Sequence, residues 1–179
     1  MADYKDPENT IVMETSKGQI VIELKPEVAP NHVARIKELS REGFYDNIVF
    51  HRVIDGFMAQ CGCPQGRGTG GSDKPDLAAE FNDEHHGRGT CSMARAQNPN
   101  SANSQFFICF DEAGFLDKQY TVWGQVVEGM DNVDNIYKEY GEGAPHGFGP
   151  EQGRIQYEGN AYLNEDFPKM DAVLEAVIS

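Results

Sequence analysis

One arginine stands among aromatic and sulfur-containing side chains in the run FHRVIDGFMAQ, residues 50–60. The guanidinium of Arg52 is a permanent cation with several N–H donors. Alternating residues before the turn pair Asp55-Gly56 predict a β-hairpin, which would place beside Arg52 the side chains of Phe57, Met58 and Gln60. No nucleophile or acid–base pair accompanies the cation, so the run favours chemistry that makes and breaks no covalent bond. The alternative is that Arg52 pairs with a surface carboxylate.

A second run, MARAQNPNSANSQFFICF at residues 93–110, predicts a strand that follows a tight turn. Successive side chains of a strand point to opposite faces, so Gln105 and Phe107 share one face while Phe106 belongs to the other. We expect Phe106 in the core, and Gln105 and Phe107 along a groove. The alternative is that both phenylalanines belong to the core.

A third run, residues 115–131, begins with apolar side chains just before a further predicted strand. Phe115, Leu116 and Tyr120 are close together in sequence at this point. They either rim the same pocket or make ordinary contacts between a loop and the strand that follows it.

Other residues that could bind a ligand or catalyse a reaction occur in less specific sequence patterns. The segment GRGTGG, residues 66–71, has the GxGxxG spacing, but Ser72-Asp73-Lys74-Pro75 follows where a dinucleotide site needs a helix to begin. We therefore expect a loop at the rim of a cleft. The serines Ser92, Ser101 and Ser104 lack a GxSxG turn, which gives a hydrolase little support.

The cysteines and the histidine pair are of the residue types that bind zinc. Cys61-Gly62-Cys63, Cys91 and His85-His86 nevertheless lack the paired CxxC spacing that structural zinc usually shows. We expect packed free thiols, solvated histidines, and no metal or other cofactor.

The elements that would position the three runs are mostly short strands. Hairpins are predicted at residues 10–24 and 50–61, and three more strands at 90–94, 105–110 and 121–127. Helices are predicted at about 30–42 and from 130 towards Gly141. This order favours a mostly antiparallel barrel with helical plugs.

The last part of the chain, residues 141–179, reads as an extension of a core at about 10–140 within one domain spanning 1–179. After a Gly/Pro-rich connector, the apolar residues have helical spacing and predict a helix over 167–178, with Phe167, Met170, Val173, Leu174, Val177 and Ile178 on one face. Such an apolar stripe must be buried, so we expect the helix to dock on the barrel. The alternative is that it binds a partner.

Composition and charge exclude several classes of function. The formal charge of −14 argues against nucleic acid as a partner and disfavours anionic membrane surfaces. The sequence contains no apolar stretch of membrane-spanning length, and its acidic, polar start does not resemble a signal sequence. Together with the expected reduced thiols, these features favour the cytoplasm.

The three runs and the GRGTGG loop, in this order and at this spacing, resemble the cyclophilin family of peptidyl-prolyl cis–trans isomerases over residues 10–140. The resemblance implies an eight-stranded antiparallel barrel closed by two helices, to which the C-terminal helix would be an addition. It also implies that the chain isomerises Xaa-Pro bonds, that it assists protein folding, and that it binds proline-containing peptides and unfolded or folding proteins. We expect a monomer.

Roles for individual residues follow from the same resemblance. Arg52 corresponds to the catalytic arginine of the family. The proline pocket would consist of Phe57, Met58, Phe107 and Leu116, the peptide backbone would be held by Gln60 and Gln105, and the residue before proline would pair near Ala94 and Arg95.

At several positions the sequence departs from the best-known family pattern. Arg95 replaces an asparagine and Tyr120 a histidine, while Cys61 and Cys63 interrupt a stretch that usually reads Gly-Gly-Asp. Phe115 stands where a tryptophan contributes to cyclosporin binding, so we expect this drug to bind weakly.

Two classes of function are consistent with these residues. An isomerase would use the arginine to stabilise the twisted amide, whereas a non-enzymatic module would only hold proline-containing partners. A pure binding module does not need Arg52 at this position, so we favour the enzyme.

Overall fold

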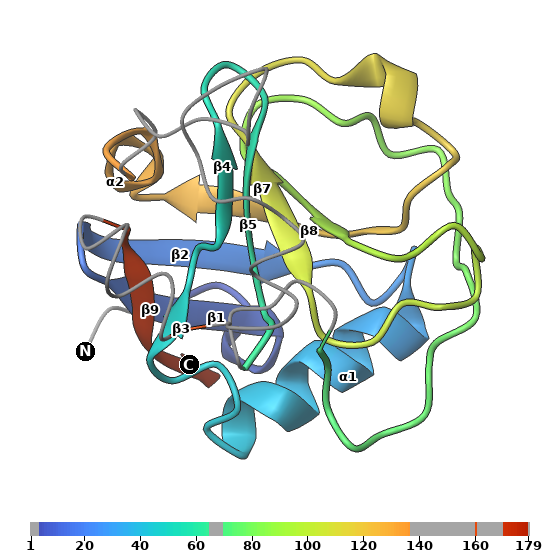
Figure 1. The fold of residues 1–179 in the computed structure, drawn as a ribbon, viewed down its shortest axis with the longest axis horizontal. Coiled ribbons are helices and arrows are strands. Elements are labelled where there is room, and N and C mark those ends of the chain that lie inside the picture. Colours follow the sequence, from blue (N-terminus) through green and yellow to red (C-terminus); the bar gives the residue numbers. More distant parts are fainter. Residues whose placement is uncertain (1–3, 65–69, 137–159, 161–169, 179) are drawn as a thin grey trace.

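The computed structural model describes residues 4–64, 70–136, 160 and 170–178 (Figure 1). Its strands are β1 Thr10–Thr15, β2 Gly18–Leu24, β3 Ile48–Val49, β4 Arg52–Ile54, β5 Met58–Cys61, β6 Thr90–Met93, β7 Phe106–Cys109, β8 Val122–Glu128 and β9 Ala172–Ile178. The helical segments are η1 Pro7–Asn9, α1 Pro30–Arg41, η2 Gly114–Leu116 and α2 Met130–Asp134. The strands join in one sheet, in the order β3-β9-β1-β2-β8-β6-β7-β5-β4. Neighbouring strands are antiparallel, so the predicted mainly β class is confirmed.

The sheet curls because its two edges are almost continuous in the chain. The edge strands β3 and β4 are separated only by Phe50 and His51. Since consecutive Cα atoms lie about 3.8 Å apart, two intervening residues cannot span an open sheet. The described sheet has nine strands rather than the predicted eight. Residues 48–54, counted as one interrupted strand, would reduce that number to eight.

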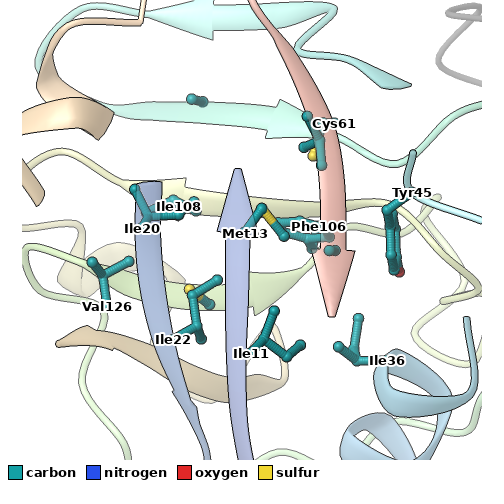
Figure 2. Packing of buried hydrophobic residues seen from close by; sticks show 14 of the residues in the cluster. Ile11, Met13, Ile20, Ile22, Ile36, Tyr45, Cys61, Phe106, Ile108 and Val126 are labelled. Atoms are coloured by element: carbon teal, nitrogen blue, oxygen red, sulfur yellow. The ribbon is translucent and has the colours of Figure 1, made fainter. Parts of the chain in front are cut away.

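Aromatic and branched side chains from several strands fill the interior of the curled sheet. The Phe106 ring is edge-on to the rings of Trp123 and Tyr45, with both centroid distances at 5.4 Å. Figure 2 shows Phe106 beside Met13 of β1. Ile20 of β2 belongs to the same cluster, and all three residues are fully buried. Truncating such a buried phenylalanine to alanine typically lowers the free energy of unfolding by about 3–5 kcal/mol, so Phe106 stabilises the fold. Its predicted place in the core is confirmed.

The predicted first helix forms as α1 and covers part of this core. Val33, Ile36 and Leu39 are buried on one face, and the helix contacts β8 and β9. Its C-terminal end is closed by Gly43, whose φ of +72° suits a residue without a Cβ. The N–H groups of Gly43 and Phe44 donate to the carbonyl oxygens of Ser40 and Leu39, which is a Schellman motif.

The predicted hairpin at residues 50–61 forms from β4 and β5. Arg52 pairs with Gln60, and Ile54 pairs with Met58. Gly56 makes the turn with a φ of +74°, a conformation that glycine adopts without steric cost. On its other side β5 pairs with β7, so the first two chemically interesting runs of the sequence are neighbours in the sheet.

The predicted C-terminal helix is wrong, because residues 172–178 form strand β9. This strand lies between β1 and β3 and pairs with both (Figure 1). Val173 and Ala176 are buried, whereas Leu174 and Val177 are 47% and 42% exposed, which is not the stripe that a docked helix would bury. A bulge in the pairing with β1 interrupts simple alternation in β9. Hydrogen bonds between the backbones of β1 and β9 stabilise the strand. The spacing of apolar residues within 172–178 gives no information about such distant partners.

Some predictions fall on residues that the structure does not describe. They concern the connector at 141–153 and Phe167. The second predicted helix forms as α2, Met130–Asp134, but it is shorter than predicted, because Asn135 and Ile136 are a turn and a bend and not helical. Of the GRGTGG loop only Gly70 and Gly71 are described, and residues 72–75 are not helical. None of the described helices has the length and apolar character that a membrane crossing requires.

Candidate active site

A small cavity of about 150 Å³ opens where the three chemically interesting runs meet. Nine of the eleven predicted site residues line it, namely Arg52, Phe57, Met58, Gln60, Ala94, Arg95, Phe107, Leu116 and Tyr120. Most of these side chains are apolar or aromatic, and Arg52 and Arg95 supply the positive charge. The cavity is well below the roughly 300 Å³ of typical small-molecule sites, so its size suits one side chain or ring.

Strand register places three of the side chains that line the cavity in one row. Arg52 of β4 is paired with Gln60 of β5, Gln60 with Phe107 of β7, and Phe107 with Ser92 of β6. Directly paired residues of antiparallel strands project to the same face of a sheet. The row therefore brings together a guanidinium, an amide and an aromatic ring from three strands. Phe106, one residue along from Phe107, points into the core instead.

Two glutamine amides hold each other at one end of the cavity. Gln60 Nε2 donates to Gln105 Oε1 over 3.0 Å, and Gln105 Nε2 donates to the carbonyl oxygen of Gly70, also over 3.0 Å. These bonds orient both amides and connect them to the glycine-rich loop. Gln105 does not line the small cavity but a larger one next to it.

The larger cavity, of about 520 Å³, was not predicted from the sequence. It shares Gln60, Ala94 and Arg95 with the small cavity and is otherwise lined by Gly70, Gly71, Ser72, Asp76, Ala96, Ser101, Asn103, Ser104 and Gln105. Asn103 organises its wall, because the N–H and hydroxyl of Ser72 both donate to Asn103 Oδ1. These residues carry no pattern in sequence, since Asn103 and Ser72 are 31 positions apart.

Arg95 and Tyr120 close another side of the small cavity. The guanidinium of Arg95 lies over the Tyr120 ring, 4.6 Å from its centroid. It also donates to the carbonyl oxygens of Ala96, Gln97 and Gln119. Tyr120 in turn packs edge-on against Phe107 at 5.9 Å. Arg95 thus fixes an aromatic wall through bonds to the backbone.

Phe115 lies outside both cavities as described, unlike its neighbour Leu116. Its side chain is 67% exposed and its ring is tilted against that of Phe57, with centroids 5.6 Å apart. Leu116 is buried and reaches the small cavity from η2. The predicted rim is therefore formed by Leu116 and Tyr120, while Phe115 extends the apolar surface beyond it.

One of two neighbouring histidines differs from the prediction that both are solvated. His85 is exposed, as expected, and contacts the carboxylates of Asp117 and Glu112. His86 is fully buried, which contradicts the expectation. Its ring lies behind Phe107, and its Nδ1 is 2.9 Å from Asp117 Oδ1. The partner of His86 is 31 positions away in sequence, so only the tertiary structure identifies it.

Histidine and cysteine ionisation follows the local environment. Burial, together with the charge of Arg52, lowers the pKa of His51 to about 4, so its imidazole is neutral near pH 7. Hydrogen bonds to Asp117 and Glu112 raise the pKa of His85 to about 8. All four cysteines are buried free thiols, and burial raises the pKa of Cys61, Cys91 and Cys109. Within the described ranges, no group of three or more His, Cys, Asp or Glu side chains could hold a metal ion.

The sequence match agrees with this geometry. The model of the family described as "Cyclophilin type peptidyl-prolyl cis-trans isomerase/CLD" matches residues 10–151. The chain belongs to the cyclophilin family. This membership confirms the predicted enzyme class, a peptidyl-prolyl cis–trans isomerase.

Several relatives carry the same enzyme name. A probable peptidyl-prolyl cis-trans isomerase of Brucella suis is 55% identical over 148 residues, which cover 76% of each chain. A peptidyl-prolyl cis-trans isomerase of Synechococcus elongatus is 45% identical over 133 residues, covering 70% of this cyclophilin and 90% of the relative.

Solved cyclophilins share the fold. The crystal structure of cyclophilin AquaCyp293 from Hirschia baltica has a TM-score of 0.75 and 30% identity, with 97% of this chain and 74% of that one covered. A Cryptosporidium parvum cyclophilin, crystallised in the presence of the dipeptide Ala-Pro, also has a TM-score of 0.75. It is 25% identical, and the match covers 95% of this chain and 98% of the other.

Proposed function

We propose that this cyclophilin accelerates rotation about Xaa-Pro bonds by using Arg52 to stabilise the twisted amide. The observation that carries the proposal is the row Arg52–Gln60–Phe107, which places a guanidinium and an aromatic ring at one cavity. The cavity would bind the proline ring, and the glutamine amides would hold the peptide backbone.

The origin of the rotation barrier explains how one cationic hydrogen-bond donor can accelerate the rotation. The peptide bond is planar because the nitrogen lone pair is delocalised into the carbonyl, and rotation about it costs about 18–20 kcal/mol. Halfway through rotation the conjugation is lost, and the lone pair is localised on a pyramidal nitrogen. A donor directed at that nitrogen binds the twisted amide better than either planar form, and only such differential binding accelerates the step.

The apolar walls would contribute in a second way. Phe107, Met58 and Leu116 are buried around the cavity, and Phe57 packs against their cluster. They would hold the ring while the carbonyl side of the bond turns. They would also remove water, whose hydrogen bonds favour the charge-separated planar amide. The scheme requires neither a covalent intermediate nor a proton transfer.

The decisive experiment compares Arg52→Ala with wild type by exchange spectroscopy on a short Ala-Pro peptide. We expect kcat/KM to fall by about 100-fold, the typical effect of removing one transition-state donor. Arg41→Ala serves as the matched control, because Arg41 of α1 is an exposed arginine that pairs with Glu8 of η1. Unchanged exchange in Arg52→Ala would refute the proposed role of Arg52. Peptide binding by wild type without faster exchange would instead favour a binding module.

We extend the proposal to the partners and the compartment. Proline-containing segments of unfolded or folding proteins would be the substrates, and assistance of folding would be the result. A refolding protein that is limited by a slow Xaa-Pro bond would then fold faster with wild type than with Arg52→Ala. The buried free thiols favour a reducing compartment such as the cytoplasm. The net charge of −14 disfavours nucleic acid and anionic membranes as partners.

A further inference from the structure

We propose that the buried imidazole of His86, paired with Asp117, is a positioning group that holds Phe107 and Leu116 at the spacing required by a proline ring. The inference rests on the proposed function, because it takes the small cavity as the proline site. It concerns a residue that does not line the cavity and would act through the two side chains that do.

The first contact is with the aromatic floor of the cavity. The His86 ring lies nearly parallel to that of Phe107, with centroids 6.1 Å apart and planes inclined by 19°. His86 has no exposed surface, whereas Phe107 reaches the cavity. The imidazole therefore backs Phe107 on the side away from the substrate.

The second set of contacts is with the segment that carries Leu116. The backbone N–H of His86 donates to Asp117 Oδ1 over 2.7 Å, and its ring Nδ1 lies 2.9 Å from the same oxygen. The carbonyl oxygen of His86 accepts from the N–H of Ala113 over 2.8 Å. These bonds connect one residue to both ends of the segment 113–117, which contains η2. Leu116 is thereby fixed relative to Phe107.

The remaining ring nitrogen is bonded to the neighbouring strand. His86 Nε2 lies 2.9 Å from Ser92 Oγ, and Ser92 is the β6 residue paired with Phe107. Because the carboxylate of Asp117 accepts from Nδ1–H, the neutral ring has Nε2 as its acceptor, and the single hydroxyl proton of Ser92 is shared between Nε2 and the carbonyl oxygen of Thr121. Burial lowers the pKa of His86, which agrees with this neutral tautomer.

The set Ser92–His86–Asp117 has the connectivity of a catalytic triad, but its burial argues against that use. Ser92 and His86 are both fully buried, and Ser92 Oγ also lies 3.1 Å from the carbonyl oxygen of Thr121. A substrate cannot reach a nucleophile enclosed in this way. A positioning role behind the pocket explains the contacts among Ser92, His86 and Asp117 without further assumptions.

The side chain of a phenylalanine or leucine at position 86 could back Phe107 but could not donate to Asp117. A glutamine could donate to Asp117 but has no ring to stack. An imidazole makes both contacts, and its other ring nitrogen also reaches Ser92 Oγ. The two walls come from β7 and from η2, so their spacing depends on a residue that contacts both.

The test compares His86→Gln with His32→Gln. His32 is the matched control because it is also fully buried and paired with a carboxylate, Glu80, 2.6 Å from its Nδ1, but it lies on α1. Thermal unfolding would show that both variants fold. On a short Ala-Pro peptide we expect His86→Gln to raise KM about fivefold with kcat within about twofold, since a loosened wall weakens ground-state and transition-state binding alike. His32→Gln should keep the KM of wild type.

A second pair of variants keeps the proposal testable if His86→Gln does not fold. Asp117→Ala removes the acceptor of both His86 N–H groups, whereas Asp117→Asn retains a carbonyl oxygen at that place. We expect KM to rise in Asp117→Ala and to return close to the wild-type value in Asp117→Asn. Equal KM in the two variants would overturn the positioning role, because KM would then not depend on an acceptor for the His86 N–H groups.

One measurement separates failure of this inference from failure of the proposed function. Titration of wild type with the Ala-Pro peptide should shift the methyl resonances of Leu116. If the peptide leaves them unmoved, the small cavity is not the proline site, and the positioning role fails with that assignment. If the peptide shifts them and His86→Gln has the KM of His32→Gln, only the positioning role is wrong.

Discussion

Two arginines line the small cavity, and their surroundings give them different tasks. The guanidinium of Arg95 donates to three backbone carbonyl oxygens and covers Tyr120. Its hydrogen bonds therefore maintain the wall of the cavity. Arg52 belongs to the cross-strand row with Gln60 and Phe107, which directs its side chain to the face where a substrate would lie.

A further prediction at the scale of single residues concerns cyclosporin. The family resemblance places Phe115 where a tryptophan contributes to binding of this drug, and Phe115 is largely exposed beside Phe57. We expect Phe115→Trp to raise the affinity for cyclosporin by about tenfold, since the indole adds apolar area and one N–H donor. Isothermal titration calorimetry would measure the change.

Phe81→Trp is the control for that experiment, because Phe81 is another exposed phenylalanine and lines neither of the two cavities at the site. A gain of the same size in Phe81→Trp would show that exposed aromatic area, and not the position beside the pocket, determines affinity.

The exposed residue His85 predicts a dependence of stability on pH. Its pKa is raised to about 8 by Asp117 and Glu112, so its charged form is favoured in the folded state. The resulting stabilisation is complete below about pH 6.5, the pKa of an unperturbed histidine, and is lost as pH rises through the folded-state value. Thermal unfolding of wild type should show this loss, and His85→Gln should not.

Catalysis should behave differently over the same range. The proposed step includes no proton transfer, so kcat on an Ala-Pro peptide should vary little between about pH 6 and 9. A bell-shaped kcat profile with the fold intact would contradict the proposed mechanism.

At the scale of elements, pairing between strands positions the site. The hairpin β4–β5 carries Arg52 and Gln60, and the pairing of β5 with β7 adds Phe107. A slip of the register by one residue would turn these side chains to the opposite face. The chain between β3 and β4 is short, so strand β9 beside β3 helps to anchor the same edge of the sheet.

Strand β9 gives a prediction that distinguishes it from a helix. Val173 is fully buried and Leu174 is 47% exposed. We expect Val173→Ala to lower the free energy of unfolding by about 2 kcal/mol, because two buried methyl groups are lost. Leu174→Ala should change it by less than about 0.5 kcal/mol. Denaturant unfolding would measure both, and comparable losses would indicate that residues 172–178 pack with the helical stripe predicted from sequence.

At the scale of the whole molecule, net charge should select among substrates. The charge of −14 creates a negative potential that attracts cationic peptides. We expect kcat/KM to be several-fold higher for a peptide with lysines flanking Ala-Pro than for one with glutamates, at about 0.01 M salt. The difference should shrink near 1 M, where the Debye length falls to about 3 Å. A ratio that is insensitive to salt would mean that local contacts, and not the overall field, cause the preference.

Association state and domain organisation stay predictions at the same scale. We expect a monomer in which residues 1–179 form one domain, and one cooperative unfolding transition with the mass of a single chain in light scattering would agree with both. Two transitions would separate the C-terminal residues from the rest, although β9 already pairs with β1.

The sequence by itself determined the local elements and the chemical character of the site. Alternation placed Phe106 in the core and Phe107 towards the cavity, and the turn at Asp55-Gly56 predicted the hairpin that carries Arg52. These features depend on neighbours within a few residues, where strand periodicity and turn preferences act.

Only the tertiary structure decided which distant groups meet. The apolar spacing of residues 172–178 suits a helix, yet pairing with β1 and β3 makes this segment a strand. His86 looked solvated in an acidic loop, yet Asp117 and Phe107 enclose it. Hydrogen bonding between strands and burial of side chains join residues far apart in the chain, and local preference is too weak to oppose these contacts.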